Sequence, residues 1–119
     1  MGGSTARLPR QIPFRNAMEI LLMGEQFSVT EAHRIGLINR VVPAAQVMSE
    51  ARRCAEVICA NGPLAVQAVK RSVLAGLGRP TAQALEKELE IGIPVSSSED
   101  AKEGTRAFKE KRKPVFKGR

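Results

Sequence analysis

Residues 23–43, MGEQFSVTEAHRIGLINRVVP, constrain the fold most tightly because they combine a helix start, a helix stop and an apolar extended run. Ser28 and Glu31 have the spacing of a capping box, in which the hydroxyl bonds to a helix amide and the carboxylate reaches back to the N-cap amide. Gly36 can adopt the left-handed conformation that ends a helix, because glycine has no Cβ penalty there. The pattern predicts a helix of about two turns from Val29 to Ile35.

The apolar run after this helix predicts a strand. Residues 37–42 are mostly apolar and partly β-branched, and Pro43 ends the run. A single strand leaves a row of backbone donors and acceptors unpaired, so it needs a neighbour. No second run of this kind is found in the 119 residues. We therefore expect a mainly α chain with one short strand, forming the C-terminal part of something larger.

Helical periodicity organises most other segments. Apolar residues recur at helical spacing from position 14 to 22, in a helix that ends at Gly24, and again over residues 47–58, 66–77 and 82–89. Asn61-Gly62-Pro63 separates two of these helices, and Gly92 with Pro94 interrupts the period of the last one. We expect two regions: residues 1–43, with two helices and the strand, and residues 44–119, a helical C-terminal region.

The last 21 residues, 99–119, are strongly basic. They hold eight basic and four acidic side chains, which is more than half of the net charge of +7. Such a segment suits an anionic partner, and it also suits the last turn of a helix, where cations are favourable. Nucleic-acid binding is disfavoured because only Phe108 and Phe116 could stack on bases. No long apolar span indicates a membrane segment.

The usual ingredients of catalysis are missing. His33 is the only histidine, and the carboxylates of residues 86–90 lie among other charges on a wet helix face. Cys54 and Cys59 point about 140° apart on a helix, so they cannot share a metal or a disulfide, and we expect buried thiols in a reducing compartment. We therefore predict no catalytic residue, no metal site and no cofactor.

Three segments resemble one known family. They are GGSTARLPR, AMEILLMGEQFSVTEAHRIGLINRVVP and SEDAKEGTRAFKEKRKPVFKGR. In order and spacing they are similar to the C-terminal part of the enoyl-CoA hydratase/isomerase (crotonase) superfamily. The resemblance implies an α/β spiral core followed by a helical trimerisation region. Strands of that core would also be the missing neighbours of the lone strand.

The resemblance implies a function for the parent protein. Members act on acyl-CoA thioesters, for example by adding water to a 2-enoyl-CoA in fatty-acid oxidation, with CoA as part of the substrate and not as a cofactor. Their two catalytic glutamates and oxyanion hole would precede this chain, which alone would be inactive. Phe108 and Lys111 match positions that contact the CoA nucleotide in relatives.

Partners and location follow from the same resemblance. We expect a homo-oligomer, either a trimer or a dimer of trimers, in the cytoplasm, or in mitochondria if a targeting segment precedes the chain. A different class of function stays open, in which the chain is a non-catalytic helical module for assembly and CoA contact.

Overall fold

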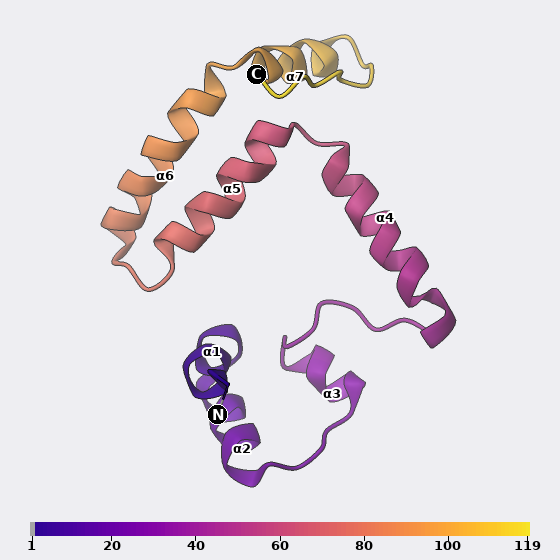
Figure 1. Ribbon diagram of the computed structural model, residues 1–119, viewed down its shortest axis with the longest axis vertical. Coiled ribbons are helices and arrows are strands. Elements are labelled where there is room, and N and C mark those ends of the chain that lie inside the picture. Colours follow the sequence, from indigo (N-terminus) through magenta and orange to yellow (C-terminus); the bar gives the residue numbers. More distant parts are fainter. Residues whose placement is uncertain (1) are drawn as a thin grey trace. The chain divides into compact units, whose positions relative to one another are not determined.

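The computed structural model describes residues 2–119, which form helices joined by turns (Figure 1). The elements are α1 (Ser4–Gln11), α2 (Phe14–Met23), α3 (Val29–Arg34), the 3₁₀ turn η1 (Ala44–Gln46), α4 (Val47–Cys59), α5 (Pro63–Gly76), α6 (Thr81–Ser96) and α7 (Glu99–Lys109). The chain divides into two compact units, one up to Met48 and one from Ser49 onward. Within the described part, no helix is both long enough and apolar enough to cross a membrane.

The first unit has a small core. Ile12, Ala17 and Ile35 are buried together, and side chains of α1, α2 and the segment after α3 pack against them. Helix α2 ends where the sequence predicts, at Gly24 with a φ of 66°. Few large side chains are buried, so this unit gains little from apolar burial.

Helix α3 is built largely as predicted. The Ser28 hydroxyl accepts the Glu31 N–H at 3.1 Å, which confirms half of the capping box. The other half is wrong, because the Glu31 carboxylate pairs with Arg34, at 2.7 Å to Nε and 2.5 Å to Nη2, and not with the N-cap amide. The helix ends at Arg34 with Ile35 as its C-cap, and Gly36 takes the left-handed conformation at a φ of 78°.

The predicted strand is wrong, since no strand forms anywhere in residues 2–119. The N–H groups of Leu37 and Ile38 both donate to the carbonyl of Ala32, at 2.9 and 3.3 Å, so the run begins as the closing turn of α3. Pro43, expected to stop a strand, instead precedes η1. An isolated extended run gains no ladder hydrogen bonds, and local bonds to the helix end replace them.

Helices α5 and α6 form an antiparallel hairpin in the second unit (Figure 1). The predicted break between α4 and α5 is confirmed, with Pro63 as the first residue of α5. The predicted interruption at Gly92 and Pro94 is wrong, because α6 continues through both residues to Ser96. Proline removes one helix hydrogen bond there, and packing along α5 outweighs local propensity.

One face of this hairpin is apolar and uncovered within the second unit. Large apolar side chains on both helices are more than half exposed: Val69, Val73, Leu77, Leu85, Leu89 and Ile93. An open groove between the helices is lined by several of them and by small residues. Exposed apolar surface of this kind marks an interaction face.

The expectation of buried thiols is also wrong for Cys59, which is exposed, while Cys54 is half-buried.

The hairpin glycines differ in the space around them. A Cβ at Gly76 would lie 3.3 Å from the Ala84 methyl carbon, whereas a Cβ at Gly92 would meet nothing within 4 Å. We expect Gly92→Ala to stabilise the chain by about 0.5–1 kcal/mol, since both residues share a helical backbone and alanine loses less entropy. Gly76→Ala is the matched control and should gain less. Urea unfolding followed by circular dichroism measures both, and an equal gain at Gly76 would contradict close packing of α5 on α6.

Candidate functional site

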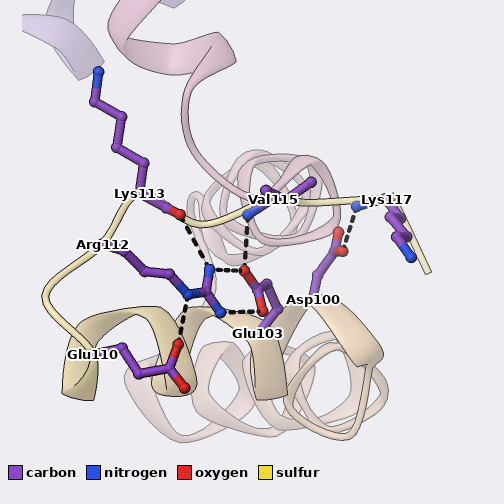
Figure 2. Close-up of polar contacts among 7 residues, drawn as sticks. All are labelled: Asp100, Glu103, Glu110, Arg112, Lys113, Val115 and Lys117. Atoms are coloured by element: carbon purple, nitrogen blue, oxygen red, sulfur yellow. Dashed lines mark hydrogen bonds and ion pairs between the residues drawn. The ribbon is translucent and has the colours of Figure 1, made fainter.

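The start of α7 places two carboxylates on one side of the helix. The Ser98 hydroxyl accepts the Ala101 N–H at 3.1 Å and so caps the start of α7. Asp100 and Glu103 lie in the first turns, three residues apart, and this spacing puts them on the same helix face. They face the chain's last ten residues, 110–119, which we call the C-terminal tail (Figure 2).

Asp100 binds the end of the tail through backbone groups. Its carboxylate accepts the N–H of Lys117 at 2.6 Å and that of Gly118 at 2.8 Å, and its own N–H donates to the Arg119 carbonyl at 3.0 Å (Figure 2 shows the Lys117 bond). Asp100 is only 5% exposed. A buried carboxylate is tolerated when its oxygens accept strong hydrogen bonds, so this contact holds the tail on α7.

Glu103 binds the start of the tail through Arg112. The two side chains form a bidentate pair, with Oε1–Nη1 at 2.6 Å and Oε2–Nη2 at 3.0 Å, and Glu103 Oε1 also accepts the Val115 N–H at 2.9 Å (Figure 2). Arg112 Nε donates to Glu110 at 2.6 Å. We call Glu103, Glu110 and Arg112 the Arg112 clamp. The planar Arg112 guanidinium donates two parallel hydrogen bonds to Glu103, so the pair fixes the orientation of the two side chains as well as their distance.

The clamp shifts the pKa values of Glu103 and Arg112. Hydrogen bonds from Arg112 and from the Val115 amide lower the pKa of Glu103 from 4.5 to about 2. The two carboxylates raise the pKa of Arg112 above its ordinary value. Glu103 is therefore ionised throughout the neutral range and is a poor proton carrier there.

An aromatic contact anchors the middle of the tail. A Cβ at Gly62 or at Gly104 would lie 3.6 Å from the Phe116 ring, so the ring packs where both glycines leave room. Gly62 precedes α5 and Gly104 lies within α7. The tail thus joins α7 to the turn between α4 and α5 within the second unit.

The sequence-predicted CoA-contact residues lie at the end of α7. Phe108 is in the last turn and is 86% exposed. Lys111 follows the helix, is exposed, and has a φ of 53°, the only positive value at a described residue other than glycine. The Lys111 N–H donates to the Phe108 carbonyl at 3.2 Å, and the Arg112 N–H donates to Ala107 at 3.0 Å. These two bonds form the Schellman turn that usually has glycine where Lys111 lies.

Sequence reasoning missed the tail contacts. The signal present in the sequence is the spacing of Asp100 and Glu103, which puts two carboxylates on one face of the helix. Elsewhere, His33 is exposed, and no group of three or more potential metal ligands occurs in residues 2–119.

Comparison with known proteins identifies relatives over the whole chain. The family model described as enoyl-CoA hydratase/isomerase matches residues 1–119. Enoyl-CoA hydratase EchA19 of Mycobacterium tuberculosis is 49% identical over 119 residues, which are 100% of this chain and 45% of that protein. (E)-benzylidenesuccinyl-CoA hydratase of Thauera aromatica is 42% identical, over 96% of this chain and 44% of its own length.

Solved structures agree with these relatives. An enoyl-CoA hydratase from Bacillus anthracis has a TM-score of 0.95 at 38% identity, covering 98% of this chain and 45% of that one. An enoyl-CoA hydratase from Mycobacterium tuberculosis has a TM-score of 0.93 at 40% identity, covering 99% and 47%. The chain spans less than half the length of these relatives. The matches confirm the expected family but do not support the expected C-terminal placement, which stays a prediction.

The clamp predicts an acid-sensitive second unit. Because folding lowers the pKa of Glu103 from 4.5 to about 2, its contribution is complete above pH 4.5 and is lost as the pH falls toward 2. We expect Glu103→Gln to be less stable than the wild type at pH 7 and to lose less further stability between pH 4.5 and 2. Urea unfolding at several pH values measures this. Glu99→Gln, which removes an exposed ion pair with Arg119, should keep the wild-type slope, and parallel slopes for all three proteins would refute the effect.

The left-handed Lys111 predicts a stabilising substitution. Lys111→Gly should stabilise the chain by about 1 kcal/mol, because glycine lacks the Cβ that strains this conformation. Gly36 occupies the corresponding position after α3 with a φ of 78°. Gly36→Ala is therefore the reverse substitution at an equivalent position, and it should destabilise the chain by a similar amount. Chemical unfolding monitors both, and a loss of stability in Lys111→Gly would rule out strain at this residue.

Proposed function

Because the chain belongs to the enoyl-CoA hydratase/isomerase family, we propose that it is the C-terminal portion of an enzyme that adds water to a 2-enoyl-CoA. The supporting observation is a family match over residues 1–119 combined with relatives more than twice as long. The order of the three sequence segments favours the C-terminal placement. The substrate class is an acyl-CoA thioester, with CoA bound as part of the substrate.

The residues that activate water belong, in this proposal, to another part of the enzyme. The carboxylates of the second unit that hold the tail are already engaged: Asp100 accepts two backbone N–H groups, and Glu103 accepts Arg112 and the Val115 amide. A carboxylate with a pKa of about 2 takes up a proton poorly at neutral pH. These two carboxylates hold the tail, which supports the proposal that the chain contributes binding rather than proton transfer.

Phe108 and Lys111 are the proposed CoA-contact residues. Both are exposed at the end of α7, and one hydrogen bond of 3.2 Å links their backbones. An ammonium suits a phosphate of the nucleotide, and an exposed ring suits stacking on adenine. Fixed placement on a helix end makes this contact a uniform-binding interaction, remote from the reacting carbon.

The alternative function is a non-catalytic helical assembly module. The exposed apolar face of α5 and α6 favours it, because such a face is stable in water only when another surface covers it. Docking on homologous subunits, as a trimer or a dimer of trimers in the cytoplasm, would provide that cover. Light scattering tests this alternative. If the chain is strictly monomeric and does not associate with a full-length relative, the assembly module is excluded.

Turnover by the chain alone tests whether the catalytic residues lie in another part of the enzyme. We expect the 119-residue chain to give no sustained hydration of a short 2-enoyl-CoA, and a chimera in which it replaces the matching part of EchA19 to be active. Absorbance of the enoyl thioester follows the reaction. Sustained turnover by the chain alone would show that its own residues suffice for catalysis.

Lys111→Ala in the same chimera tests the CoA contact. We expect KM to rise several-fold with kcat nearly unchanged, as when uniform binding is lost. Lys113→Ala removes an equal charge two residues away and should change KM less. A fall in kcat at constant KM, or equal effects of the two substitutions, would contradict a specific contact at Lys111.

A further inference from the structure

We infer that the Arg112 clamp positions Lys111 for the CoA phosphate by holding its backbone in the left-handed turn after α7. This inference rests on the proposed CoA contact and assigns Glu103 and Arg112 as positioning residues. Neither residue needs to touch the ligand. Their role is to keep a charged side chain at a turn position where glycine would be easier.

The clamp closes on both sides of Lys111. Glu110 and Arg112 are its immediate neighbours, and their side chains pair across it at 2.6 Å. Arg112 is also gripped by both oxygens of Glu103, which lies two turns back on α7. Lys111 thus lies in the sequence between two residues whose side chains are paired, and Glu103 holds one of them, Arg112, to the helix (Figure 2 shows the Glu103–Arg112 and Glu110–Arg112 contacts).

The left-handed conformation of Lys111 needs this support. After α3, the same pair of closing hydrogen bonds surrounds Gly36, which has no Cβ and no strain. At Lys111 a Cβ is present, and a strained conformation persists only when surrounding contacts over-determine it. The clamp supplies those contacts. Glycine at this position would relieve the strain but remove the ammonium.

The end of the tail, from Phe116 onward, is held by contacts outside the clamp. Asp100 binds residues 117 and 118, and Phe116 packs beside Gly62 and Gly104. Loss of Glu103 therefore loosens the turn at Lys111 while the far end of the tail keeps its own contacts. This separation makes the positioning role measurable.

The experiment is a CoA titration of the 119-residue chain followed by amide NMR. We expect Lys111→Ala and Glu103→Gln each to weaken CoA binding by roughly threefold or more, and the double variant to bind no more weakly than Lys111→Ala alone, because both changes remove one interaction. Glu99→Gln, the matched removal of a carboxylate on the same helix, should bind like the wild type. The coupling between the Lys111 amide and α protons reports φ and should change in Glu103→Gln.

The outcomes separate the two proposals. Unchanged affinity in Lys111→Ala would overturn the CoA contact itself. A weakened Lys111→Ala with an unaffected Glu103→Gln, or a Glu103→Gln penalty that persists in the Lys111→Ala background, would overturn the positioning role alone. If the Lys117 and Gly118 amides show that Glu103→Gln releases the whole tail, Arg112→Lys keeps the charge and removes the bidentate geometry. The positioning role then requires that Arg112→Lys weaken CoA binding by itself and add no further loss in the Lys111→Ala background.

Discussion

Two carboxylates on one helix face hold the end of this chain in place. The C-terminal tail has no helix or strand of its own, so its backbone donors need partners from elsewhere. Asp100 and Glu103 supply them, by accepting the N–H groups of Lys117, Gly118 and Val115. Charged acceptors make stronger hydrogen bonds than neutral ones. The tail is consequently ordered by α7 rather than by its own sequence.

This attachment shapes the end of α7 where the proposed ligand contact lies. Arg112 is drawn back toward Glu103, so the chain must reverse within a single turn, and Lys111 takes the left-handed conformation at that turn. Phe108 stays outside the contact and is exposed. A rigid helix end that presents a ring and an ammonium suits uniform binding of a nucleotide, while the lowered pKa of Glu103 makes this carboxylate a poor proton carrier at neutral pH.

Local patterns in the sequence predicted many helix boundaries well. Ser28 caps α3 as expected, and Gly24 and Gly36 end α2 and α3. Predictions failed where a competing contact decided the outcome. Residues 37–42 have strand-like composition, but within the described chain they find no ladder partner, and the carbonyl of Ala32 takes their first two N–H groups. Pro94 has helix-breaking chemistry, yet α6 continues through it because α5 packs alongside.

In the candidate site, too, local features could be predicted from the sequence and long-range contacts could not. Phe108 and Lys111 could be chosen from the sequence because a family resemblance marked them, and the pattern of carboxylates and basic residues around them was visible. The sequence by itself determined the helical periodicity, the caps and the basic C-terminal segment, because these depend on residues three or four positions apart. Only the tertiary structure decided that Asp100 binds Lys117, 17 residues away, and that Lys111 is strained. Contacts at that separation require the chain to fold back, and the residue that accepts the returning backbone is selected by packing rather than by spacing.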